Sequence, residues 1–215
     1  MQAHVAVMSP FSTSSHPVSP ARIAVIGDSI AYGQNDPSGG WSRILAAEFQ
    51  SVDQPGRRWW NLAIPGDTLV NLESYAVDEV RVRQADTVLI SAGINDLTFG
   101  TSPERLMVAV RSLVRRLDFL GARSVVATPV WYDGAVRSRE YNPIPDAAVA
   151  QFRELLLDWG EAEQRRVLDL WPVLQQRPDL LDDGLHPTAQ GHVLLADAWR
   201  AALASRFFFR ALLLR

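Results

Sequence analysis

The hydrophobic residues of this chain follow two alternating patterns. Short, nearly continuous apolar runs, which are typical of strands buried on both faces of a sheet, recur along the sequence. These predicted strands are 22–27, 57–64, 85–93, 122–130 and 165–170. Longer segments with apolar residues at helical spacing lie between most of them. These predicted helices are 41–49, 102–121, 145–163 and about 187–205.

This alternation predicts one α/β domain. Parallel strands need long crossover connections, usually helices, so the pattern favours a mostly parallel sheet covered on both faces. The 215 residues are enough for one full core, and we find no internal repeat or second domain. We expect a flexible lead over 1–20, a domain over 21–205 and an apolar C-terminal extension over 206–215.

Composition and charge limit the binding partners and the cellular location that we expect for this protein. A net charge of −3 offers no general attraction for nucleic acid or anionic lipid. The absence of cysteine excludes disulfides, a thiolate nucleophile and Cys-ligated zinc. No uncharged apolar run approaches the roughly 18 residues of a transmembrane span. The first twenty residues lack the basic and continuous apolar regions of a signal peptide. We therefore expect a cytoplasmic protein without a transmembrane segment.

Small polar residues follow the predicted strands. The stretches after the first four strands are "GDSIAYG", "PGDT", "GINDL" and "PVWYDG", and the loop after the last strand leads into "DDGLHP". Ligands of parallel α/β sheets bind outside the carboxyl ends of the strands. This edge is therefore where we expect a functional site.

Three of these residues each have a structural and a chemical explanation. Ser29 fits a helix cap or turn, but its hydroxyl would also be presented at the sheet edge. Gly66 fits a Pro-Gly turn, but a glycine also lets its amide approach a bound oxyanion. Asn95 fits a cap or an Asx-turn, but it is also an uncharged donor suited to a developing negative charge. Alone, each structural explanation is sufficient.

The loop near the C-terminus places a carboxylate beside an imidazole. Asp183 precedes His186 by three residues, so the two side chains can meet within one turn. A purely structural alternative is an Asp-Gly turn followed by Pro187 at the start of a helix. Asp182 is the neighbouring acid, expected to be solvated. His192, on the following helix, is the one substitute for the base and is expected to be structural.

Four blocks of the chain together resemble a known family. In order, "VIGDSIAYG", "NLAIPGDT", "SAGINDL" and "DDGLHPTAQGH" resemble the blocks of the SGNH hydrolases, also called the GDSL esterase and lipase family. The resemblance covers about 22–204, and "GDSI" replaces the name-giving "GDSL". It implies a flavodoxin-like three-layer α/β/α sandwich with a five-stranded parallel sheet.

The resemblance also implies roles for individual residues. Ser29 would be the nucleophile, His186 its general base and Asp183 the carboxylate that orients the imidazole. The amides of Ser29 and Gly66, with the Asn95 side chain, would form the oxyanion hole. This set implies a serine esterase that acts on a small-molecule carboxylic ester through an acyl-enzyme, without cofactor or metal.

The substrate is less well determined by the sequence. No inserted domain or long apolar lid is evident, which favours short acyl chains over the longer ones of a lysophospholipase or thioesterase. The long loop after the fourth strand carries Trp131, Tyr132 and Tyr141, which either line a substrate pocket or pack the loop onto the domain. Arg137 and Arg139 of this loop either meet an anionic group or are solvated.

The C-terminal "RFFFRALLLR" has three open explanations. It could dock on the domain, form a contact between two copies in a homo-oligomer or touch lipid. It is too short to span a bilayer.

Two other classes of function compete with the esterase. Asp28, Asp67, Asp96 and Asp183 could form a Mg²⁺ site for phosphoryl transfer, since hard cations take oxygen ligands. The chain has no lysine and no Lys-bearing phosphate loop, so we instead expect Asp28 and Asp96 to accept hydrogen bonds from loop amides. A non-catalytic flavodoxin-like binding module would have no need for the serine, asparagine, aspartate and histidine together.

Overall fold

A parallel sheet between two helical layers forms the body of the protein. The structure, a computed structural model, describes residues 20–51, 55–136 and 143–204. The sheet has five strands in the order β2-β1-β3-β4-β5, and all neighbouring pairs are parallel. The strands are β1 (Arg22–Gly27), β2 (Arg58–Asn61), β3 (Thr87–Ser91), β4 (Arg123–Ala127) and β5 (Val167–Leu168).

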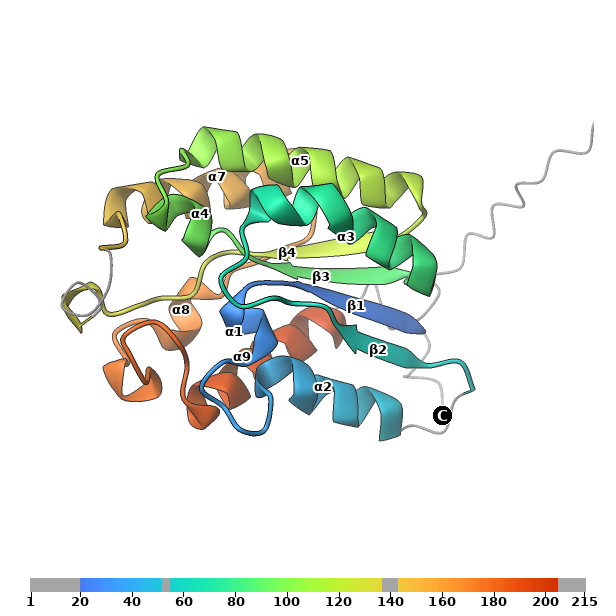
Figure 1. Ribbon diagram of the computed structural model, residues 1–215, viewed down its shortest axis with the longest axis horizontal. Coiled ribbons are helices and arrows are strands. Elements are labelled where there is room, and N and C mark those ends of the chain that lie inside the picture. Colours follow the sequence, from blue (N-terminus) through green and yellow to red (C-terminus); the bar gives the residue numbers. More distant parts are fainter. Residues whose placement is uncertain (1–19, 52–54, 137–142, 205–215) are drawn as a thin grey trace, which may run out of the picture.

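Helices cover both faces of this sheet (Figure 1). Helices α3, α5 and α7 pack together on one face, and α2 and α9 pack together on the other. The main helices are α2 (Gly40–Ser51), α3 (Leu69–Arg83), α5 (Pro103–Phe119), α7 (Asp146–Ala162) and α9 (Ala189–Ala204). The short ones are α1 (Ser29–Tyr32), α4 (Ile94–Thr98), α8 (Trp171–Leu174) and a 3₁₀ turn at Pro178–Leu180.

The predicted fold class is confirmed. The three layers and the strand order are those of a flavodoxin-like sandwich. The central strands β1 and β3 are almost wholly buried, which explains why they read as continuous apolar runs. The edge strand β5 is only two residues long, because just Val167 and Leu168 pair with β4. The predicted lead and C-terminal extension lie outside the described residues.

Helix α3 was not predicted, although its signals are present in the sequence. Thr68 caps its start by accepting a hydrogen bond from the Asn71 amide at 3.1 Å. Its apolar residues recur at helical spacing and face the sheet. The buried ones are Leu69, Leu72, Ala76, Val77 and Val80.

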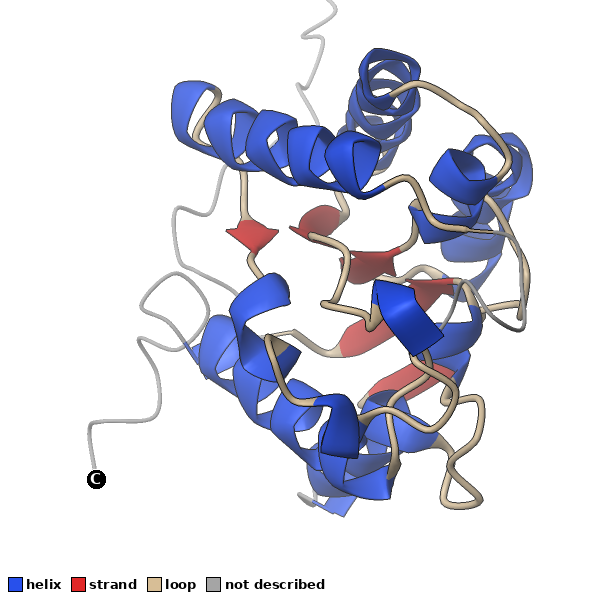
Figure 2. Ribbon diagram, turned by 90° about the vertical axis from the view of Figure 1, so that its left-hand side faces the viewer, coloured by secondary structure: helices blue, strands red, loops and turns tan. Residues whose placement is uncertain are grey.

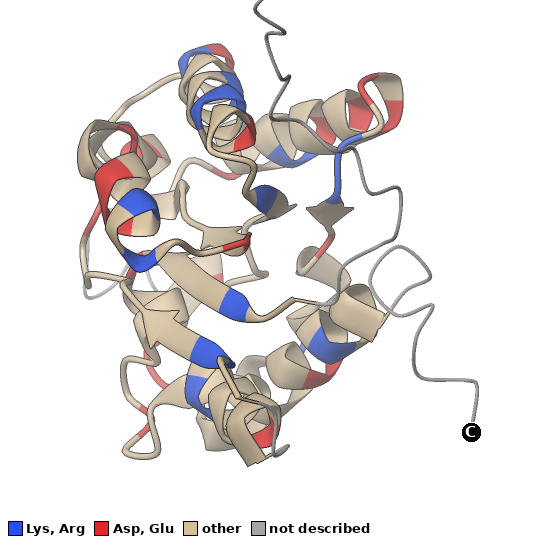
Figure 3. Cartoon of the chain, turned by 90° about the vertical axis from the view of Figure 1, so that its right-hand side faces the viewer, with Lys and Arg blue, Asp and Glu red and all other residues tan. Residues whose placement is uncertain are grey.

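The two ends of the parallel strands differ in character. Figure 2 looks onto the carboxyl ends of the strands, where the connecting loops gather. At the opposite, amino ends of the strands, β1, β2 and β4 each begin with arginine, as the blue segments in Figure 3 show. The strand order reverses between β1 and β3, which is where open α/β sheets form their ligand crevice.

Close packing of β1 and β3 shapes this crevice. A Cβ atom at Gly27 would lie 2.1 Å from the Ser91 carbonyl oxygen, so only glycine fits at the end of β1. The Asp28 amide then donates to the same carbonyl at 3.2 Å. The loops that follow β1 and β3 are therefore held side by side.

Candidate active site

The turn after β1 presents Ser29 at the carboxyl edge of the sheet. Asp28 is the N-cap of α1, and its carboxylate accepts a hydrogen bond from the Ile30 amide at 3.0 Å. Ser29 is thus the first residue of α1, with its side chain in the crevice and only 5% of the residue exposed. This confirms the expectation that Asp28 binds a loop amide.

A loop just before α9 carries the imidazole to the same place. The Nε2 atom of His186 lies 2.9 Å from the Ser29 Oγ atom. The Nδ1 atom of His186 lies 2.7 Å from the Asp183 Oδ2 atom. The structure therefore brings the predicted serine, histidine and aspartate into one hydrogen-bonded chain. Such a chain can move a proton from a serine hydroxyl to an imidazole whose second nitrogen is held by a carboxylate.

Asp183 also organises its own loop. Its Oδ1 atom accepts hydrogen bonds from the amides of His186 at 2.8 Å and Leu185 at 3.0 Å. Burial alone would raise the pKa of the Asp183 carboxyl, but these amides and the His186 imidazole outweigh it and lower that pKa. The carboxylate is therefore ionised at neutral pH and able to hold the imidazole.

The loop after β2 and the helix after β3 are joined at the site. The Asn95 Nδ2 atom donates a hydrogen bond to the Asp67 carbonyl at 2.9 Å, next to Gly66 in the chain. Gly66 is exposed and has φ +80°, and a Cβ atom at this position would have no neighbour within 4 Å. Within the described residues, the amides of Ser29 and Gly66 make no internal hydrogen bond. All three predicted donors thus retain an N–H available for a ligand.

Two contacts that support this arrangement were not foreseen. The Tyr75 hydroxyl donates a hydrogen bond to the Asp67 carboxylate, whose other oxygen accepts from the Thr68 amide at 2.9 Å. Asp67 and Tyr75 lie on opposite sides of a helix start, and only the trajectory of α3 brings them together. Tyr75 lies eight positions after Asp67, so recognising α3 from its Thr68 cap and apolar spacing is the signal that could have indicated this pair.

Asp96 ties α4 to the start of α3. Its carboxylate accepts hydrogen bonds from the amides of Leu69 at 2.7 Å and Val70 at 3.2 Å, as the sequence led us to expect. Burial raises the pKa of Asp96. Burial, reinforced by the nearby Asp96 carboxylate and opposed by amide hydrogen bonds, raises the pKa of Asp28 to about 7.

The four acidic residues of the alternative Mg²⁺ site are separately engaged. Each of Asp28, Asp67, Asp96 and Asp183 accepts hydrogen bonds from backbone amides. Among residues 20–51, 55–136 and 143–204, no group of three or more His, Asp or Glu side chains is arranged to hold a metal ion.

The substitute residues lie apart from the Ser29 contact. Asp182 is exposed, and its amide donates to the His186 carbonyl at 2.8 Å. His192 is completely buried under the start of α2, where its Nδ1 atom accepts a hydrogen bond from the Trp41 amide at 3.4 Å. Burial lowers the pKa of His192. Its neutral ring is thus part of the packing between α9 and α2.

The aromatic residues after β4 have different positions. Tyr132 is buried, donates a hydrogen bond to the Asp146 carboxylate at 2.5 Å and meets the Trp171 ring edge-on. Trp131 is half-buried and packs against the core. Both contacts correspond to the packing alternative. Tyr141, Arg137 and Arg139 lie outside the described residues.

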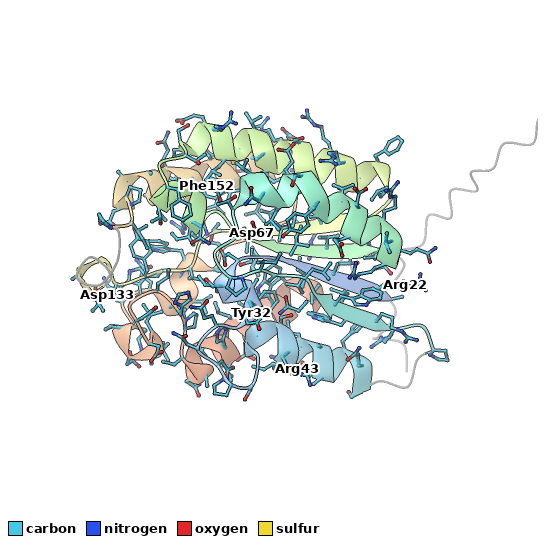
Figure 4. All side chains as sticks on the ribbon, in the orientation of Figure 1. Arg22, Tyr32, Arg43, Asp67, Asp133 and Phe152 are labelled. Carbon is cyan, nitrogen blue, oxygen red and sulfur yellow. The ribbon has the colours of Figure 1, made fainter. Side chains whose placement is uncertain are left out.

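This segment also supports the loop that carries the histidine. The Asp133 amide donates a hydrogen bond to the Gly184 carbonyl at 2.7 Å, directly after Asp183. Figure 4 labels Asp133 at the carboxyl-edge end of the molecule, away from Arg22 at the other edge. The loop after β4 therefore borders the site.

Comparison with known proteins gives a sequence match and several structural ones. The profile of the GDSL-like lipase/acylhydrolase family matches residues 25–194. A comparison with curated proteins gives no match. In the part of the chain that the structure describes, no helix combines the length and apolar character needed to cross a membrane.

Solved structures of similar fold include an acetylxylan esterase from Geobacillus stearothermophilus. The two share 20% identity with a TM-score of 0.69, over 90% of this chain and 98% of that one. A member of the lipolytic protein G-D-S-L family from Veillonella parvula shares 17% identity with a TM-score of 0.69, over 84% of this chain and 96% of that one. At these identities the likeness establishes the fold.

Proposed function

The chain belongs to the GDSL-like lipase/acylhydrolase family, and we propose that it is a serine esterase that hydrolyses short-chain carboxylic esters through an acyl-enzyme. One observation carries this proposal. Ser29, His186 and Asp183 form a continuous chain of contacts of 2.9 and 2.7 Å at the carboxyl edge of the sheet. Family membership makes the protein a carboxylic ester hydrolase. The contacts among Ser29, His186 and Asp183 would supply its nucleophile and the base that activates it.

Acylation begins at the serine hydroxyl. The neutral Nε2 atom of His186 accepts the Ser29 proton as the Oγ atom attacks the carbonyl carbon of the ester. The resulting tetrahedral intermediate carries its negative charge on the former carbonyl oxygen. His186 then returns the proton to the alcohol oxygen as the bond between that oxygen and the carbonyl carbon breaks, which leaves an acyl group on Ser29.

Three N–H groups would stabilise the charge on that oxygen. They are the amides of Ser29 and Gly66 and the side chain of Asn95. The hydrogen bond from Asn95 to the Asp67 carbonyl supports this role, because it uses one N–H of the amide group and orients the other. Preorganised donors of this kind act mainly when charge develops in the transition state.

Deacylation reuses the same groups. His186 removes a proton from water, the water oxygen attacks the acyl carbon, and the proton returns to Ser29 as the acid departs. Asp183 stabilises the imidazolium in both halves of the cycle. The lowered pKa of the Asp183 carboxyl supports this role, because a carboxylate stays charged throughout.

The acetylxylan esterase adds indirect support. Its alanine substitutions at one serine, one aspartate and one histidine are described as catalytic mutants, and the aspartate and histidine are three positions apart. Asp183 and His186 are three positions apart here as well. That enzyme's name also favours an acetyl group as the acyl part.

The acyl preference has a direct test. We expect kcat/KM on p-nitrophenyl esters from acetate to palmitate to peak between acetyl and butyryl. A peak at long chains would instead favour the lysophospholipase or thioesterase alternative. Repeating the series with a chain that ends at Ser205 separates the two sources of such a peak. Loss of the long-chain peak on truncation would assign it to the C-terminal segment, which lies outside the described residues.

A further inference from the structure

Asn61 is a polar residue of the "NLAIPGDT" stretch that the mechanism above does not use. It is the last residue of β2 and lies beside Val25 in the register of β1 and β2. Gly66 follows five positions later in the same stretch. Asn61 is exposed, so water could satisfy its amide group, yet that group binds two separate segments of the protein.

The Nδ2 atom of Asn61 holds the far end of helix α1. It donates a hydrogen bond to the Ala31 carbonyl at 3.0 Å and lies 3.5 Å from the Tyr32 carbonyl oxygen. These are the last two residues of α1, and the final carbonyls of a helix have no partner within the helix. A helix of only four residues is not stable by itself, so its orientation depends on such contacts. Ser29 is the first residue of this helix.

The Oδ1 atom of Asn61 holds the segment that leads to Gly66. It accepts a hydrogen bond from the Ala63 amide at 3.1 Å, which bends the chain directly after β2. The Ile64 carbonyl then accepts from the Asp67 amide at 3.1 Å. This bond closes a turn whose third residue is Gly66, and φ +80° at that position fits a type II turn. The direction of the Gly66 amide is thus set by a hydrogen-bonded segment that starts at Asn61.

Asn61 therefore joins the two segments that carry the backbone donors of the proposed oxyanion hole. The backbone also links them, because the Ile64 amide donates to the Gly27 carbonyl at 3.0 Å, just before α1 begins. Asn61 adds a second attachment at the other end of the same helix. Two attachments at opposite ends resist a tilt of α1 that one attachment would allow.

We propose that Asn61 is a positioning residue that aligns the Ser29 amide with the Gly66 amide for the transition state. This inference rests on the proposed function, which assigns both amides to the oxyanion hole. Such donors act only when they lie at hydrogen-bond distance from the oxygen that becomes charged. A displacement of about 1 Å can cost roughly 10²-fold in rate. Loss of the Asn61 contacts should therefore lower kcat more than it changes KM.

Asn61→Asp tests the contact with α1 by the smallest change in shape. The carboxylate keeps an acceptor for the Ala63 amide, but it has no N–H for the Ala31 carbonyl. We expect kcat for p-nitrophenyl acetate to fall at least about tenfold, with KM nearly unchanged. Active sites are counted by titration with a serine-directed fluorophosphonate, so that unfolded protein does not lower kcat. Asn71→Asp adds the same charge at an exposed position of α3 and should keep full kcat.

A double-mutant cycle separates positioning from a general loss of structure. Asn61→Ala removes both side-chain contacts without adding a charge, and it is combined with Asn95→Ala. If Asn61 acts through the oxyanion hole, the loss of kcat in the double variant should be smaller than the product of the two single losses, because groups that act as a unit are not additive.

Two results would overturn the inference. One is full kcat per active site in Asn61→Asp and Asn61→Ala. The other is a loss in the double variant that equals the product of the single losses, which would show that Asn61 acts independently of the oxyanion hole. Failure of the proposed function has a different signature, which is normal hydrolysis by Ser29→Ala.

Discussion

The Nε2 atom of His186 lies 2.9 Å from the Oγ atom of Ser29, although 157 positions separate the two residues in the chain. The contact exists because β1 ends at the same sheet edge to which the loop before α9 returns. The imidazole is held from behind by Asp183 of its own loop. The Ser29 hydroxyl, from the N-terminal part of the domain, and the His186 imidazole, from its C-terminal part, thus meet in the crevice between β1 and β3.

Replacement of Asn95 tests the oxyanion hole. Asn95→Ala should lower kcat for p-nitrophenyl acetate by about 10²–10³-fold with little change in KM, because the donor acts mainly on the charged transition state. Asn71→Ala, at an exposed position of α3, is the matched control and should be fully active. A loss confined to KM would show that Asn95 binds the ground state instead.

Tyr75 is predicted to act through the Asp67 loop. Tyr75→Phe removes the hydroxyl that binds the Asp67 carboxylate and should lower the free energy of unfolding by about 1.5 kcal/mol. Because the Asp67 carbonyl orients Asn95, kcat should also fall while KM is retained. Tyr32→Phe provides the control, measured on p-nitrophenyl acetate. Unchanged kcat in Tyr75→Phe would limit its role to stability.

Asp28 is predicted to make stability depend on pH. Its pKa is raised from 3.8 to about 7 in the folded protein, so between these values the folded state binds more protons than the unfolded state. The free energy of unfolding should therefore fall as pH rises through this range, by at most about 4 kcal/mol. Urea denaturation from pH 4 to 8 should show a smaller fall for Asp28→Asn, whose side chain stays neutral. Asp96 titrates in both proteins, so parallel curves would refute the assignment to Asp28.

Replacement of Asp183 should lower kcat much more than it lowers the stability of the fold. Asp183→Asn keeps the shape of the side chain but cannot stabilise an imidazolium, so kcat should fall by about 10⁴-fold. Circular dichroism checks that the variant is folded. Near-normal kcat in a folded Asp183→Asn protein would remove Asp183 from the mechanism.

The sequence predicted those parts of the site that depend on strand ends and local spacing. Ser29 and Asn95 each follow a buried strand, so a parallel sheet necessarily brings them to one edge. Asp183 and His186 are close in the chain, and one turn is sufficient for their contact.

Features that depend on how distant elements pack could not be predicted in this way. The Trp41 amide donates a hydrogen bond to the Nδ1 atom of His192, 151 positions away, and only the packing of α2 against α9 brings the two together. The burial of Tyr132 required the Asp146 carboxylate of α7 as its partner. Hydrophobic periodicity gives the type of an element, but not the neighbours of each side chain.

The central claim is that Ser29, activated by His186, is the acyl-accepting nucleophile. Peptide mass spectrometry after reaction with a serine-directed fluorophosphonate tests it most directly. We predict a single covalent adduct on the peptide that contains Ser29, absent in Ser29→Ala and strongly slowed in His186→Ala, with both variants folded and nearly inactive on p-nitrophenyl acetate. An adduct on another residue, or near-normal hydrolysis by Ser29→Ala, would contradict it.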